Sequence, residues 1–120
     1  MLHHVGIEVA PANVERSAGL FELLGFERVE PPETLRDYTW LERDGTQVHL
    51  MPAEKPVAPP RGHLAVVVPD FEATLARLAE RGFEIERRRA HWGAPRAVVH
   101  APGEHRVELM AAPPDSRLRR

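Results

Sequence analysis

The chain has 120 residues, no cysteine and a formal net charge of −2. This length fits one domain, or two small halves with a shared core, and the lack of cysteine excludes disulfides, a thiolate nucleophile and a cysteine-based zinc site. No apolar run approaches the about 20 residues of a membrane span, and no signal peptide is visible. The slightly acidic balance argues against nucleic acid as a partner. We therefore expect a cytoplasmic protein with neither a membrane nor a nucleic-acid partner.

The first half of the chain predicts one helix and four strands. Apolar periodicity and turn residues place the helix at residues 13–24 and the strands at residues 3–10, 26–30, 38–43 and 46–51. Asn13 is the expected N-cap of the helix, and Gly25 its end. Asp44-Gly45 joins the last two strands and is a strong signal for a two-residue hairpin turn.

A proline-rich segment at residues 52–61 separates this half from a second half of the same order. Here the helix is expected at residues 70–81 and the strands at residues 63–68, 83–88, 96–101 and 106–111. Asp70 is the expected N-cap and Gly82 the helix end. Each half is thus a βαβββ module. We predict a single domain over residues 1–112, built from repeats 2–51 and 62–112, with a flexible tail at 113–120.

The two halves also repeat in sequence. A shift of 59 positions places residues 4–9 on 63–68 and residues 48–51 on 107–110. Four residue types that bind metals recur at equivalent places in this repeat: His4, His49, His63 and Glu108. A duplicated fold would bring them together around a pseudo-twofold axis. The fold class we expect is α+β, with two tandem modules that form a cupped mixed sheet.

Strand alternation places the polar candidates on one face of each sheet. Residues i and i+2 of a strand share a face, so His4 and Glu8 point away from the apolar residues that pack against the helix. By the same rule Gln47 lies beside His49, and Arg106 beside Glu108. A polar face opposite the helix is what a lined cavity requires.

Three segments resemble the vicinal oxygen chelate superfamily, of the glyoxalase/bleomycin resistance protein/dioxygenase type. They are Leu2-His3-His4-Val5-Gly6-Ile7-Glu8-Val9, Gly62-His63-Leu64-Ala65-Val66-Val67-Val68-Pro69-Asp70 and Ala101-Pro102-Gly103-Glu104-His105-Arg106-Val107-Glu108-Leu109. The last is similar to the family ending Asp-Pro-x-Gly-x-x-x-Glu-Leu, with Ala101 in the Asp position. The resemblance covers residues 2–112 and implies a homodimer, in which the modules pair either within one chain or between two.

The resemblance also implies that His4, His49, His63 and Glu108 bind one divalent metal ion per site. His49 is a departure, because glyoxalase-like members usually carry Glu there and epimerase-like members Gln. Imidazoles with one carboxylate suit Fe²⁺, Mn²⁺, Co²⁺, Ni²⁺ or Zn²⁺. The ion would act as a Lewis acid on two neighbouring substrate oxygens. Glu108 is either a ligand only or also the catalytic base.

Four further residues are candidates for substrate binding. Arg106 would bind a substrate carboxylate or phosphonate, or else form a surface ion pair. Gln47 would hydrogen-bond substrate or face solvent. Trp92 and Tyr38 would wall the cavity or pack in the core or at its rim.

The function that follows is a metal-dependent enzyme on a small oxygenated substrate, bound through two oxygens: an isomerase, lyase or thiol transferase. One alternative is a metal-free protein that binds an antibiotic or another small ligand. Another is an extradiol-type dioxygenase, because two His and one Glu form a suitable triad. A descendant without turnover also remains open. His100 and His105 have no partner in the repeat and are expected at the surface.

Overall fold

The computed structural model describes residues 1–115 and contains two compact units. The first unit comprises residues 1–62 with residues 101–105, and the second comprises residues 63–100 with residues 106–115. Residues 113–115 have no regular structure, and the rest of the predicted tail lies outside the described residues. In the described part of the chain, no helix has the length and apolarity that a membrane crossing requires.

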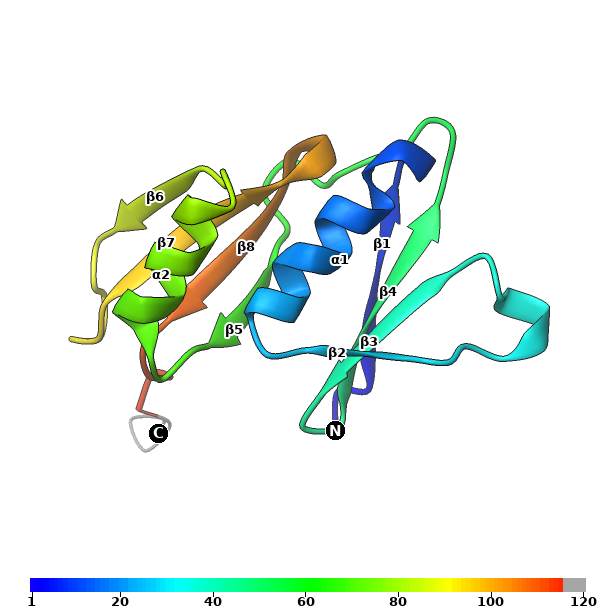
Figure 1. Cartoon of the computed structure of the whole chain (residues 1–120). Coiled ribbons are helices and arrows are strands. Elements are labelled where there is room, and N and C mark those ends of the chain that lie inside the picture. The colour runs from blue at the N-terminus through cyan, green and yellow to red at the C-terminus, as the bar shows by residue number, and fades with distance from the viewer. Residues whose placement is uncertain (116–120) are drawn as a thin grey trace. The chain divides into compact units, whose positions relative to one another are not determined.

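The first module contains one α-helix and a four-stranded sheet (Figure 1). Its elements are β1 (His4–Val9), α1 (Val14–Leu23), β2 (Glu27–Val29), β3 (Thr39–Arg43) and β4 (Thr46–Pro52), with short 3-10 turns at Pro11–Asn13 and Glu33–Leu35. The strand order is β1-β4-β3-β2. Strands β1 and β4 are parallel, whereas β3 is antiparallel to both of its neighbours. After β1 the helix therefore leads to β2 at the opposite edge of the sheet, and the chain comes back through β3 so that β4 lies beside β1.

The second module repeats this architecture. Its elements are β5 (Leu64–Val67), α2 (Phe71–Glu80), β6 (Ile85–Arg88), β7 (Arg96–Ala101) and β8 (His105–Met110), with a 3-10 turn at Pro102–Glu104. The strand order is β5-β8-β7-β6, and β5 is parallel to β8 as β1 is to β4. The predicted α+β class with two tandem βαβββ modules is confirmed, and the strands form two four-stranded mixed sheets.

The helix ends lie where the glycine and N-cap signals predict, but the capping side chains make other contacts. Gly25 and Gly82 follow α1 and α2 with φ of +94° and +82°, a backbone region that favours glycine. Asn13 and Asp70 occupy the N-cap positions as predicted, but neither side chain bonds a helix N–H. A 3-10 turn already occupies Asn13. Asp70 instead accepts hydrogen bonds from the Thr74 hydroxyl at 3.0 Å and the Arg77 guanidinium at 3.1 Å.

Each helix packs its apolar side on its own sheet, and the two cores match. Leu20 and Phe21 of α1 are fully buried, as is Leu78 of α2. Leu50 on β4 and Leu109 on β8, equivalent at the 59-residue shift, are both 0% exposed. Burial of such side chains is the main stabilising term for each module.

An arginine on the second strand of each sheet also pairs with the helix of the same module. Arg28 binds both carboxylate oxygens of Glu15 on α1, at 2.8 and 3.2 Å. Arg87 binds both oxygens of Glu72 on α2 in the same way. Hydrogen bonds from these guanidinium groups hold the pKa of the Glu15 and Glu72 carboxyls below their usual value. The repeat therefore extends to an ion pair that the sequence analysis did not anticipate.

Candidate metal centre

The candidate ligands of the two modules occupy equivalent positions in two parallel strand pairs. In the first sheet His49 lies opposite Gly6, and in the second Glu108 lies opposite Ala65. His4 and His63 each come two residues before these partners, at or next to the start of the first strand of their sheet. Because the two strand registers are identical, the two candidates of each sheet lie on the same face and at the same positions along the strands.

In the first unit the two candidates and Trp40 form a stack of three rings. The His4 and His49 rings are nearly parallel, with 4.1 Å between centroids, and the Trp40 indole lies on the other face of His49 at 3.9 Å. A metal ion lies near the plane of an imidazole that binds it, along the nitrogen lone pair. Two stacked rings therefore cannot both bind one ion in this orientation. His4, which is exposed, is the ring with room to turn.

A hydrogen-bond chain on the same face fixes the edge of His49. Its Nε2 lies 2.8 Å from the Gln47 Oε1, and the Gln47 amide nitrogen donates to Glu42 Oε1, also at 2.8 Å. His49 is only 7% exposed. Burial lowers its pKa below the ordinary value, and the nearby charges of His4 and His3 lower it further. The ring is thus biased toward the neutral form that metal binding requires.

In the second unit the candidates form an ion-pair chain. Glu108 Oε1 lies 3.1 Å from His63 Nε2, and its Oε2 accepts a hydrogen bond from Arg96 at 3.1 Å. The Arg96 Nε also donates to the Arg89 carbonyl at 2.7 Å. The side chains of Glu108 and Arg96 are 12% and 16% exposed, whereas that of His63 is 44% exposed. Both carboxylate oxygens are therefore satisfied by protein groups.

The sequence analysis missed Trp40, Glu42 and Arg96. Trp40 and Glu42 could have been found from the hairpin signal at Asp44-Gly45. A two-residue turn fixes the strand register, and this register places Trp40 opposite His49 and Glu42 opposite Gln47. Arg96 opens a strand that neighbours β8, so its proximity to Glu108 required the order of the second sheet. Among residues 1–115, the structure places no group of three or more His, Asp or Glu side chains as a ready metal site.

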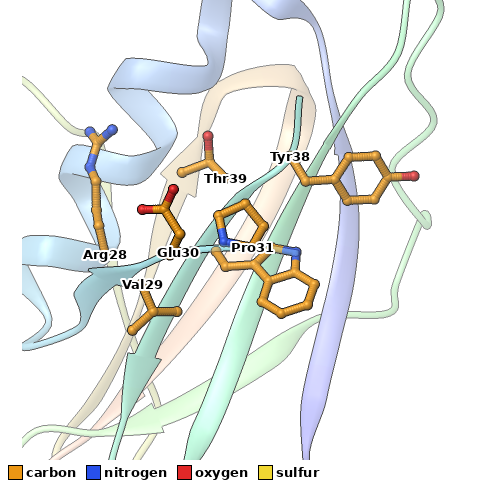
Figure 2. A pocket seen from close by; sticks show the side chains of 7 residues that line it. Arg28, Val29, Glu30, Pro31, Tyr38 and Thr39 are labelled. Carbon is orange, nitrogen blue, oxygen red and sulfur yellow. The ribbon is translucent and has the colours of Figure 1, made fainter. Parts of the chain in front are cut away.

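The predicted substrate residues lie in different settings. Arg106 is half-buried on the same strand as Glu108, and Gln47 bonds Glu42 and His49. Trp92 donates its indole N–H to the Ala112 carbonyl at 2.8 Å. Tyr38 lines an open hollow of about 270 Å³, which Figure 2 shows with Arg28 on its opposite side. Trp40 lines the same hollow, and its buried indole N–H has no partner among the described residues.

The surface position predicted for His105 is wrong. His105 is 7% exposed, and its Nε2 donates to the Glu8 backbone carbonyl at 2.7 Å. His100, for which a surface position was also predicted, is half-buried, and its Nε2 lies 2.9 Å from a carboxylate oxygen of Glu86. Neither contact has a counterpart in the repeat, and the repeat was the only signal that the prediction used.

Comparisons with known proteins agree with this architecture. Residues 2–109 match the sequence profile of the Glyoxalase/Bleomycin resistance protein/Dioxygenase superfamily. Among solved structures, the glyoxalase family protein from Enterococcus faecalis has 24% identity and a TM-score of 0.71, with 92% of this chain and 96% of that chain covered. Oxidase ChaP-H2 has 21% identity and a TM-score of 0.74, with 97% and 96% covered.

The fosfomycin resistance protein FosX from Mesorhizobium loti has 18% identity and a TM-score of 0.72, with 99% of this chain and 97% of that chain covered. At such identities these structures show the fold alone. No curated protein matches the chain.

Proposed function

The chain belongs to the Glyoxalase/Bleomycin resistance protein/Dioxygenase superfamily, and on that premise we propose that it is a divalent-metal-dependent enzyme. It would act on a small oxygenated substrate that is held through two oxygens. The observation that carries this proposal is the equivalence of the two ligand pairs, His4 with His49 and His63 with Glu108. Each pair belongs to two parallel strands in the same register, with His63 directly before the first residue of β5.

The donor set fits a first-row divalent ion. His4, His49, His63 and Glu108 offer three imidazoles and one carboxylate, a set that suits Fe²⁺, Mn²⁺, Co²⁺, Ni²⁺ or Zn²⁺. The low pKa of buried His49 favours its neutral form. Such an ion, when bound, supplies Lewis acidity to a substrate oxygen.

The protein groups around Glu108 would then control its charge and orientation. Arg96 and His63 each engage one oxygen of this nearly buried carboxylate, so its geometry is set before any ligand arrives. We assign Glu108 to proton transfer at the substrate, since it is the one carboxylate in the donor set. Arg106 is the group we assign to an anionic part of the substrate, because a guanidinium binds carboxylate or phosphonate with two hydrogen bonds.

The test is the metal content of the purified chain, measured by elemental mass spectrometry after reconstitution with each candidate ion. We expect about one tightly held ion per chain in the wild type, and loss of that ion in Glu108→Gln. Glu86→Gln is the matched control, because Glu86 also contacts a histidine and an arginine, His100 at 2.9 Å and Arg88 at 3.2 Å. Retention of no ion by the wild type under any condition would overturn the proposal.

A second candidate function is a metal-free binding protein for a small ligand. The specific observation in its favour is that both ligand pairs are internally satisfied: His49 is stacked and hydrogen-bonded, and Glu108 is paired with Arg96. A chain that retains no metal but binds planar ligands, with a change in Trp40 fluorescence, would establish this alternative. The expected homodimer stays a prediction that light scattering would check.

A further inference from the structure

We propose that Glu42 and Gln47 are positioning residues that hold His49 in the tautomer with its proton on Nε2 and leave Nδ1 as the acceptor nitrogen. The relevance of this to metal binding rests on the function proposed above. The tautomer itself is a property of the metal-free chain, and it is decided by the hydrogen-bond directions along one face of the first sheet.

The direction of the chain of hydrogen bonds follows from Glu42. An ionised carboxylate only accepts hydrogen bonds, so the group that Gln47 turns toward Glu42 must be its NH₂, at 2.8 Å. The amide oxygen of Gln47 is thereby turned toward His49 Nε2, also at 2.8 Å. An amide oxygen cannot donate, so Nε2 must hold the proton. In neutral His49 the lone pair is then on Nδ1.

The backbone holds these groups in place. Glu42 lies opposite Gln47 and Trp40 opposite His49 in the antiparallel β3–β4 pair, so one hairpin register sets both contacts. The rings of Trp40 and His4 cover the two faces of His49 and restrict its rotation. Among the described residues no hydrogen bond engages His49 Nδ1.

This arrangement has a consequence for how His49 would bind. Binding through Nε2 would take the donor away from the Gln47 oxygen and leave that partly buried group without a partner, which is costly. Binding through Nδ1 leaves the Glu42–Gln47–His49 chain intact. A histidine whose second nitrogen donates to a fixed acceptor is the usual arrangement around protein-bound metals. Gln47 would therefore act through His49 and would not itself touch substrate.

The test is long-range ¹H–¹⁵N correlation spectroscopy of the metal-free chain with ¹⁵N-labelled histidine, at about pH 8, above the ordinary histidine pKa of about 6.5. His49 is assigned from its loss in His49→Asn. We expect the wild type to show His49 as the Nε2–H form, with an observable Nε2 proton. His105 serves as an internal reference, because its Nε2 donates to a backbone carbonyl and should stay in that form throughout.

Variants at Gln47 separate positioning from mere packing. Gln47→Met removes the acceptor, and we expect the Nδ1–H fraction of His49 to rise several-fold and the Nε2 proton signal to broaden. The exchanged pair Glu42→Gln with Gln47→Glu restores both an acceptor for Nε2 and a donor between the two side chains, and it should restore the wild-type pattern. An unchanged His105 signal shows in each variant that the fold persists. A wild-type His49 with its proton on Nδ1, or a tautomer insensitive to Gln47→Met, would overturn the inference. Neither outcome depends on whether the chain binds a metal.

Discussion

The two units place different chemistry on the same backbone positions. In the first unit His49 is held between two aromatic rings and an amide, whereas in the second Glu108 is held between an arginine and a histidine. Their strand registers and the burial of their cores match. Duplication has thus preserved strand pairing and core packing, while the polar face of each sheet has diverged. Substitutions in the two units can measure how much the cores, the polar faces and the ion pairs each contribute to stability.

The largest effect is expected in the two cores. Leu50→Ala and Leu109→Ala each remove a fully buried side chain at an equivalent position. Each should lower the free energy of unfolding by about 2–5 kcal/mol, through lost burial and the cavity left behind. Urea unfolding followed by circular dichroism would measure both. If the loss of unfolding free energy lies within this range for one variant and outside it for the other, the two cores are not equivalent.

A smaller loss is expected when the Glu108 chain is broken. Arg96→Gln leaves a carboxylate that is 12% exposed without its cationic partner. We expect a loss of about 1–3 kcal/mol, which is typical for a buried group left unsatisfied. Arg88→Gln is the control, since its side chain is 43% exposed, and it should have a smaller effect. Equal effects of the two substitutions on the urea midpoint would contradict the buried role of Arg96.

In the first unit, His49 makes the folding stability depend on pH. The pKa of folded His49 is lowered by burial, so below the ordinary value of about 6.5 the unfolded chain takes up the proton first. The contribution of His49 is therefore complete above that pH and decreases as the pH falls toward the lowered folded pKa. We expect thermal stability to fall less steeply below about pH 6.5 in His49→Asn than in the wild type. Parallel pH profiles for the two proteins would argue against this assignment.

The smallest effect is expected at the exposed pairs between helix and sheet. Glu15→Gln and Glu72→Gln each break the pair with Arg28 or Arg87, and salt screens such pairs strongly. The changes in melting temperature should be small, similar in the two modules, and smaller still in 1 M salt. A large, salt-independent loss in either variant would mean that the pair contributes more than surface electrostatics.

The sequence predicted the order of elements because repeats, glycines and alternation are local signals. Both helices, all eight strands and the Asp44-Gly45 turn were expected close to where they lie. The faces of His4, His49 and Glu108 followed from period-two alternation. Membership of the superfamily followed from the same motifs.

What the sequence did not predict depends on side chains from different strands. The pairing of Arg96 with Glu108 requires the sheet order, and the burial of His105 requires a contact across 97 positions of sequence. Asn13 and Asp70 are at the predicted N-cap positions, but their capping hydrogen bonds are replaced by a 3-10 turn and by bonds to neighbouring side chains. In each case a tertiary or local alternative outweighed the propensity of a single residue.

The first unit is discontinuous in sequence, and the bond from His105 to the Glu8 carbonyl joins its two segments. The first unit therefore lacks residues 101–105 until the chain has been synthesised through residue 105. Closing a contact between such distant residues is slow compared with the local pairing of β3 and β4. A fragment that ends at residue 62 would have a complete sheet but no His105. Although the sequence repeats as two halves, a cut at residue 62 would not separate the two units, because residues 101–105 belong to the first.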